Sequence, residues 1–330
     1  MRLLRSKAAV AVSVVLLLTV LAFLASLLTP TVELTRFRNS LLAELGTPAD
    51  FNWTPENLPV GYRAETLDAP APIRDGAASV QDFETTVDKM TGLVGHLRSK
   101  PKKRGPIKSD TLTTYRIIRT EGRGYCADYT QVFNALAHGA KLPVREWGMS
   151  FDRFGGDGHA FSEVYDALSG NWVFVDPMHG FFVRSAATGQ PLSVLEFRAQ
   201  LTRPEGFDEL EFVPIDDAFM FDSARKAYDY YRDGADQFFL WFGNDVFSYD
   251  AHGVVQTFGF SRSVEQLAAI IVGVHPKIRV LGTATNGVEI ESLMALRNTV
   301  LSLVGLAALL GCIVFAQVLM LAFGRRRSRS

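Results

Sequence analysis

The hydrophobic pattern of the chain is strongest at its two ends. Ala8–Thr29 and Asn298–Gly324 are uncharged, mostly apolar runs of 22 and 27 residues. A helix of about 20 apolar residues is long enough to cross the roughly 30 Å hydrocarbon core of a bilayer. The pattern therefore predicts two transmembrane helices.

Basic residues flank both predicted spans on the side of the chain ends. Arg2, Arg5 and Lys7 precede the first span, and four arginines follow the second (Arg325, Arg326, Arg327 and Arg329). Because basic flanks stay in the cytoplasm, both termini are predicted to be cytoplasmic and residues 30–297 to lie across the membrane. The alternative for the first run is a cleaved signal peptide, but its apolar core is longer than the usual stretch of roughly 7 to 15 residues.

Three segments between the two predicted spans have a sequence pattern that predicts their structure. Thr47–Pro72 holds five prolines and is expected to be an irregular surface segment. Ser79–Leu97 has apolar residues at intervals of three and four, which predicts an amphipathic helix. Ser223–Phe242 is rich in aromatic residues and is predicted to be a helix whose aromatic side chains pack in a core or near the membrane.

The middle of the chain predicts a helix followed by three strands. Two glycines precede Cys126, and apolar positions then recur with helical spacing as far as Ala140. Runs rich in β-branched and aromatic residues predict strands over Val144–Met149, His159–Tyr165 and Asn171–Asp176. The fold class is therefore α+β, with a helix directly before an antiparallel sheet.

The last two of these strands form a predicted hairpin with a defined register. A turn centred on Leu168 and Ser169 places Asp176 opposite Phe161, two residues from His159 and on the same face of the sheet. Diagonal neighbours of this kind lie about 7 to 8 Å apart at Cα. We therefore expect the imidazole of His159 to meet the carboxylate of Asp176.

Charge excludes one class of partner. The chain has 330 residues, and the region between the spans holds 27 basic and 35 acidic residues, a net charge of −8. Nucleic acid is not expected as a partner, because it is bound by basic surfaces. Six basic residues lie close together within this acidic region (Arg98, Lys100, Lys102, Lys103, Arg104 and Lys108). They are predicted to form a solvated loop, and the alternative is a patch that binds anionic lipid headgroups or an acidic glycan.

A single cysteine lies outside the predicted spans, at a position suited to chemistry. Cys126 begins a helix, where free backbone N–H groups and the helix dipole favour a thiolate. A thiol nucleophile also needs a base to take its proton and an acid to orient that base, and His159 with Asp176 would supply both. A metal site built on Cys126 and His159 is a poorer alternative, because structural zinc takes four ligands and the chain has no Cys-x-x-Cys pair.

In this order and context the residues resemble the transglutaminase-like superfamily. The similarity covers about 55 of the 330 residues, in separate blocks that include an apolar-Pro-x-Arg step after the helix (Gly124–Tyr129, Leu142–Arg145, His159–Tyr165 and Trp172–Pro177). The resemblance implies a papain-like α+β core. It further implies Cys126 as the nucleophile, His159 as the general base and Asp176 as the residue that orients the base.

The remaining parts of such a site are open. Besides the Cys126 backbone N–H, candidates for the oxyanion site or the wall of the cleft are Tyr125, Phe161 and Trp172, and a side chain within Thr111–Arg119 is a further alternative. Phe161 stands where many members of the family have Trp. His179 is the alternative base. The chain has no run of calcium-ligating acids, so neither a metal nor a cofactor is expected.

Together these features imply a membrane-anchored cysteine enzyme that acts on amide or peptide bonds outside the cytoplasmic membrane through a thioester, with hydrolysis favoured over cross-linking. The expected substrate is an envelope protein, a peptide or a polysaccharide-linked molecule. Small residues of the second span could also contact partners in the membrane. The alternative is a catalytically silent scaffold or binding module in envelope or polysaccharide assembly.

The predicted organisation follows from these assignments. A cytoplasmic start (1–7) and a first span (8–29) are followed by an ectodomain. The ectodomain has an N-terminal part (30–110), a transglutaminase-like core (111–190) and a C-terminal part with no assigned role (191–297). A second span (298–324) and a basic tail (325–330) complete the predicted organisation.

Overall fold

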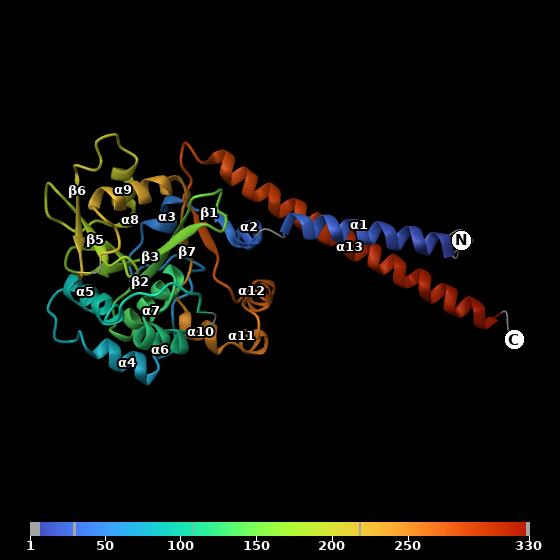
Figure 1. Ribbon diagram of the computed structural model, residues 1–330, viewed down its shortest axis with the longest axis horizontal. Coiled ribbons are helices and arrows are strands. Elements are labelled where there is room, and N and C mark those ends of the chain that lie inside the picture. Colours follow the sequence, from blue (N-terminus) through green and yellow to red (C-terminus); the bar gives the residue numbers. More distant parts are fainter. Residues whose placement is uncertain (1–6, 29–30, 108, 218, 328–330) are drawn as a thin grey trace. The chain divides into compact units, whose positions relative to one another are not determined.

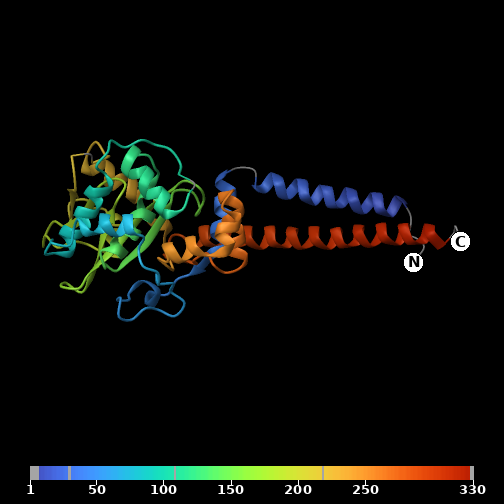
Figure 2. The ribbon, with the colours of Figure 1, turned by 90° about the horizontal axis from the view of Figure 1, so that it is seen from below.

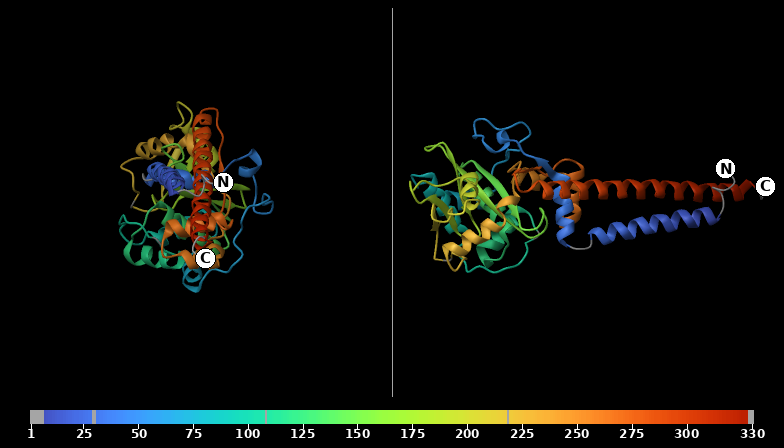
Figure 3. Two further views of the ribbon diagram at one scale, coloured as in Figure 1. Left: turned by 90° about the vertical axis from the view of Figure 1, so that its right-hand side faces the viewer. Right: turned by 90° about the horizontal axis from the view of Figure 1, so that it is seen from above.

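Both apolar runs form helices. The computed structural model describes residues 7–28, 31–107, 109–217 and 219–327, with α1 over Lys7–Leu28 and α13 over Gly287–Arg327. Each contains an apolar window long enough to cross a membrane, and only 6% of each window is buried. The two predicted spans are therefore present as helices without a protein core around them. α13 begins earlier than predicted and is continuous in Figure 2 and Figure 3.

Several residues used in the sequence analysis lie outside this description. They are Arg2, Arg5, Thr29, Pro30, Lys108 and Arg329, together with the side chains of Arg325, Arg326 and Arg327. The chain divides into two compact units, of which the first is Met1–Leu41 with Val288–Ser330 and the second is Leu42–Gly287. The first unit holds α1, α13 and most of α2 (Thr31–Leu42), and Arg36 of α2 donates to the Ser292 hydroxyl of α13 at 2.5 Å.

The second unit is built on one sheet. Its described strands are arranged in the order β1-β8-β7-β2-β3-β4-β5-β6, and neighbours are antiparallel except for the parallel pair β1 and β8. The strands are β1 Ala43–Leu45, β2 Val144–Ser150, β3 Gly158–Asp166, β4 Asn171–Asp176, β5 Phe181–Ser185, β6 Leu210–Pro214, β7 Phe238–Trp241 and β8 Ile278–Val280. Three of these strands come from residues 191–297, so that segment completes the sheet.

Helices cover both faces of the sheet (Figure 1). The remaining helices of this unit are α3 Pro48–Phe51, α4 Ala71–Ala78, α5 Thr86–Leu97, α6 Thr111–Glu121, α7 Cys126–Gly139, α8 Val194–Leu201, α9 Ala224–Asp233, α10 Val246–Ala251, α11 Gly253–Phe258 and α12 Arg262–Ile271, with a 3-10 turn at Ala235–Gln237. One apolar core lies between α4–α7 and the sheet and includes Phe133 and Val164. A second, aromatic core lies under α8 and α9 and includes Phe161, Phe174 and Tyr231. This arrangement places the start of α7 beside the middle of the sheet.

The predicted hairpin register is confirmed. Ser162 pairs with Val175 and Val164 with Val173, which is the register set by a turn at Leu168 and Ser169. Strand side chains alternate between faces, so His159, Phe161 and Asp176 lie on the face that packs under α9. The three predicted strands and the helix from Cys126 are each observed to within a residue of their predicted ends.

Two helix predictions are wrong in part. The helix predicted over Ser79–Leu97 begins only at Thr86, because the Thr85 hydroxyl accepts a hydrogen bond from the Asp88 N–H and caps it there. The helix predicted over Ser223–Phe242 ends at Asp233, and Phe238–Trp241 is strand β7 instead. A short apolar run fits either structure, and pairing with β2 and β8 decides for the strand.

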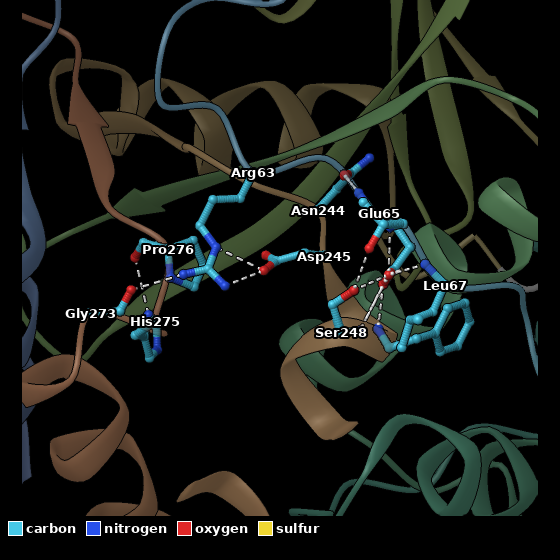
Figure 4. A network of polar contacts seen from close by, with 11 residues as sticks. Arg63, Glu65, Leu67, Asn244, Asp245, Ser248, Gly273, His275 and Pro276 are labelled. Carbon is cyan, nitrogen blue, oxygen red and sulfur yellow. Dashed lines mark hydrogen bonds and ion pairs between the residues drawn. The ribbon is translucent and has the colours of Figure 1, made fainter. Parts of the chain in front are cut away.

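The proline-rich segment Thr47–Pro72 contains the short helix α3 and is held in place by a polar network (Figure 4). Arg63 donates to the Asp245 carboxylate at 2.8 Å and to the Gly273 carbonyl at 2.9 Å. Glu65 accepts from the Phe247 N–H at 2.5 Å and from the Ser248 hydroxyl at 2.5 Å. These contacts fix the α10–α12 region to the N-terminal part of the same unit.

Candidate active site

The backbone before α7 places Cys126 at the first position of that helix. Gly122 ends α6 in the left-handed conformation, with φ +68°, and a Cβ there would lie 2.2 Å from the Pro101 carbonyl oxygen. Tyr125 then caps α7 in an extended conformation, and its N–H donates to the Asp128 carboxylate at 2.8 Å. Cys126 is partly buried at a helix end whose first N–H groups have no partner within the helix.

His159 and Asp176 meet as the register requires. Nε2 of His159, on β3, lies 2.7 Å from Oδ2 of Asp176, at the end of β4, and both side chains are buried. Since Nε2 is engaged by the carboxylate, Nδ1 is the ring nitrogen left for the thiol, with which His159 also forms a hydrogen bond. The Ala160 N–H is a second donor to the sulfur. The three side chains therefore form one connected chain.

Asp176 is held by more donors than the sequence suggested. Its Oδ2 also accepts from Nδ1 of His179 at 2.6 Å and from the Tyr231 hydroxyl at 2.5 Å. Its Oδ1 accepts from the backbone N–H groups of Met178 and His179 at 2.9 and 2.8 Å. A buried carboxylate with this many donors stays ionised and fixed in position.

The pKa shifts of the site favour separated charges on Cys126 and His159. Burial raises the pKa of the Cys126 thiol, but the hydrogen bond and charge of His159 outweigh it, so the net pKa is lowered. Burial lowers the pKa of His159, whereas the Asp176 carboxylate beside it raises the pKa to about 10. Burial likewise opposes ionisation of Asp176, but His179 and His159 hold its pKa well below the usual range. The site therefore favours a Cys126 thiolate and a His159 imidazolium over the neutral thiol and neutral imidazole, with Asp176 ionised beside them.

His179 shares Asp176 but differs from His159 in charge. Burial is the main cause that lowers the pKa of His179, and the neighbouring His159 lowers it further. The rings of the two histidines are stacked, with centroids 4.5 Å apart. The hydrogen bond that lowers the pKa of Cys126 comes from His159, which makes His159 the better placed base.

Three of these side chains could also face a cation. The ligand atoms of His159, Asp176 and His179 lie within 4.8 Å of one another. In the described geometry each imidazole directs one nitrogen at Oδ2 of Asp176 at hydrogen-bond distance. These hydrogen bonds account for the cluster.

Part of the chain is similar to known proteins. Residues 77–177 match the model of the transglutaminase-like superfamily. This segment is transglutaminase-like. No curated protein matches the chain. Among solved structures, the periplasmic domain of TgpA from Pseudomonas aeruginosa, bound to ethylmercury, matches at 18% identity with a TM-score of 0.29. The match covers 44% of this chain and 49% of that domain, so the chain spans about half of its length.

The other predicted residues of the transglutaminase-like site lie in different surroundings. Phe161 packs beneath His159, with ring centroids 6.0 Å apart, and is fully buried in the aromatic core. Tyr125 caps the helix with an exposed ring. Trp172 is not brought to Cys126, because it lies four residues from Asp176 along β4, about 13 Å at the usual strand rise. Its ring packs instead on the guanidinium of Arg145, 4.1 Å from the ring centroid.

The proposed alternative donors of Thr111–Arg119 also make contacts elsewhere. The Thr111 hydroxyl accepts from Gln131 at 2.7 Å, and the Tyr115 hydroxyl lies 2.9 Å from Nε2 of His96. Arg119 donates to the His96 carbonyl. These contacts bind α6 to its neighbours.

A second polar chain links α7 to β3 and β2. The Ser162 hydroxyl donates to the Asn134 amide oxygen at 2.7 Å, and the Asn134 amide nitrogen donates to Glu146 at 3.0 Å. Burial, followed by the charge of Cys126, raises the pKa of Glu146 to about 8. The Glu146 carboxyl group is therefore neutral at pH 7, and no motif in the sequence pointed to it.

Proposed function

We propose that this chain is a membrane-anchored, transglutaminase-like cysteine enzyme that cleaves amide or peptide bonds outside the cytoplasmic membrane. The observation that carries the proposal is the connected chain of Cys126, His159 and Asp176 at the start of a helix. A bound carbonyl carbon could reach the thiol there, beside backbone N–H groups suited to an oxyanion. The two apolar terminal helices support the anchoring.

The reaction follows from the charges of the site. The Cys126 thiolate attacks the carbonyl carbon, so that a C–S bond forms and the negative charge moves to the carbonyl oxygen. The His159 imidazolium then gives its proton to the leaving nitrogen, the C–N bond breaks and an amine departs, leaving a thioester on Cys126. Asp176 remains ionised and stabilises the imidazolium throughout.

The second half of the reaction regenerates the thiolate. Neutral His159 takes a proton from water, the oxygen attacks the thioester, and the C–S bond breaks to release a carboxylic acid. A primary amine could replace water and give a new amide. We favour hydrolysis, because cross-linking requires a site that excludes water and holds an amine.

The location and the substrate belong to the same proposal. With both termini in the cytoplasm, the catalytic unit lies in the periplasm or outside the cell, where the substrate would be an envelope protein, a peptide or a polysaccharide-linked molecule. The second span could contact partners in the membrane. The competing proposal is a silent scaffold or binding module, which would need none of the charge separation between Cys126 and His159.

Alkylation of Cys126 against pH tests the enzyme proposal directly. The protein is the full chain in detergent, with Cys312→Ser so that a single thiol reacts. We expect an inflection well below the ~8.5 of a free thiol, and we expect His159→Ala to move it upward. An ordinary thiol profile that ignores His159→Ala would instead support the scaffold. Incubation with candidate envelope peptides, followed by mass spectrometry of Cys126, would then identify the acyl group.

A further inference from the structure

We propose that Lys102 forms a subsite for a carboxylate carried by the acyl donor, next to the bond that Cys126 attacks. The inference rests on the proposed function and deepens it by giving the substrate a chemical class. It begins from the basic run Arg98–Lys108, for which the sequence left a solvated loop and an anion-binding patch as alternatives.

The basic run is anchored to the turn that precedes the nucleophile. The Lys103 N–H donates to the Gly122 carbonyl at 2.8 Å, and the Gly124 N–H donates to the Lys103 carbonyl at 3.2 Å. Arg123 donates to the Pro106 carbonyl at 3.0 Å. These bonds hold the main chain of Lys103 beside Gly124, which is two residues before Cys126, so a freely solvated loop does not describe this segment.

Lys102 lies on this anchored segment and is partly buried. Its Nζ lies 3.4 Å from the Met220 sulfur and 5.2 Å from the ring centroid of Tyr129, a residue of the nucleophile helix. By contrast, Arg98 at the start of the run is paired with the Asp216 carboxylate at 2.7 Å and donates to the Met178 carbonyl. Among the described residues, Lys102 has no ion-pair partner.

The charges that act on Lys102 include those of the candidate active site. Burial lowers the pKa of Lys102 to about 8, while the charges of Asp176 and Cys126 act to raise it. Lys102 also contributes to the lowered pKa of His179. At pH 7 the side chain is therefore a cation, within electrostatic reach of the nucleophile and without a carboxylate of its own.

A carboxylate of the substrate fits this position better than a neutral group. A partly desolvated ammonium interacts with an anion more strongly than it would in water. Tyr129 and Met220 offer the ammonium a ring face and a thioether, which leave its charge uncompensated. A donor with a carboxylate near its scissile carbonyl would supply the missing partner, whether the carboxylate comes from an acidic side chain or from a chain end.

Two alkylating reagents test this without a known substrate. Iodoacetate and iodoacetamide form the same S–CH2 bond with loss of iodide, but only iodoacetate carries a carboxylate beside the reacting carbon. In the full chain with Cys312→Ser, we expect Lys102→Met to slow iodoacetate about fivefold or more and to change iodoacetamide less than twofold. Lys102→Arg should retain most of the preference for iodoacetate, and added salt should reduce it.

Matched variants separate the possible outcomes. Lys100→Met removes an exposed lysine of the same run and should change neither rate, and Lys102→Gln serves if the Met variant does not fold. If both reagents slow equally, Lys102 supports the thiolate and the carboxylate subsite is wrong. If neither slows, the subsite is also wrong. An ordinary thiol pH profile that ignores His159→Ala overturns the enzyme proposal instead, and the ratio of the two rates still reports on Lys102.

Discussion

His159 and His179 share one acceptor atom. Nε2 of His159 and Nδ1 of His179 lie 2.7 and 2.6 Å from Oδ2 of Asp176, and the two rings are stacked at 28°. Two imidazolium ions would repel each other at this distance, so the site favours one charge. The pKa of His159 is raised to about 10 and that of His179 is lowered, which assigns the charge to His159.

This asymmetry predicts different effects for the two histidines. His159→Ala removes the imidazolium that stabilises the thiolate, so the pH inflection of Cys126 alkylation should rise toward that of a free thiol. His179→Ala leaves Asp176 with His159, Tyr231 and its backbone donors, so the inflection should stay in place while the melting temperature falls. Equal upward shifts in the two variants would show that His179 acts on the thiol as well.

Tyr231 gives a second prediction, on stability. Its hydroxyl donates to Asp176 at 2.5 Å, and its ring belongs to the aromatic core. Tyr231→Phe keeps the ring and removes a hydrogen bond to a charged group, which should cost about 1.5 to 3 kcal/mol of unfolding free energy. Tyr228→Phe is the control, because that hydroxyl makes only a long contact of 3.4 Å with the Arg203 carbonyl. Denaturant unfolding in detergent checks both, and equal losses would contradict the assigned hydrogen bond.

The contact of His159 with Asp176 could be predicted from sequence because it depends on local structure. A turn of defined length fixes the hairpin register, and strand alternation then puts both side chains on one face. The same reasoning could not reject Trp172, which shares that face but lies at the far end of β4. Alternation gives the face of a residue, whereas its distance from the nucleophile depends on where α7 meets the sheet.

Tyr231 and Lys102 could not be predicted in the same way. Tyr231 lies 55 positions from Asp176 and reaches it only because α9 covers one face of the sheet. The sequence shows that the segment is rich in aromatic residues, but it does not show which residues they pack against. Lys102 was visible as part of a basic run, yet its place at the site depends on backbone pairing of Lys103 with the turn before Cys126. Both contacts are set by tertiary packing rather than by any local pattern.

Arg145 leads to a third prediction, about the apolar-Pro-x-Arg step. Its buried guanidinium donates to Glu163 at 2.6 Å and to the Phe51 carbonyl at 2.7 Å, with tryptophan rings around it (Trp53, Trp147 and Trp172). Arg145→Met leaves the Glu163 carboxylate buried without its cation, which should cost about 3 to 5 kcal/mol. The role of Arg145 is structural, so we expect Arg145→Met to lower the stability of the fold rather than to act directly on the reaction of Cys126.

The double variant Arg145→Met with Glu163→Gln tests that explanation. The Trp147 indole and the Val194 N–H donate to different oxygens of Glu163, so a neutral Gln can accept from one of them, and it leaves no unpaired charge in the core. Thermal unfolding of the full chain should therefore show the double variant to be more stable than Arg145→Met alone. If the two are equally unstable, loss of packing against the tryptophans, rather than an unpaired charge, explains the effect.

Glu146 supports the last prediction, which concerns the pH dependence of stability. Its pKa in the folded protein is raised to about 8, from an ordinary value of 4.5, chiefly by burial. The unfolded chain therefore releases this proton first, so the contribution of Glu146 to stability is greatest below pH 4.5 and is lost as the pH rises to about 8. Glu146→Gln removes this loss and should be more stable than the natural chain by about 2 to 3 kcal/mol at pH 7. The difference should shrink at pH 5 and level off above pH 8, whereas exposed Glu205→Gln should show no such trend in denaturant titrations. A constant difference across pH would mean that Glu146 is ionised in the folded protein and that its pKa is not raised.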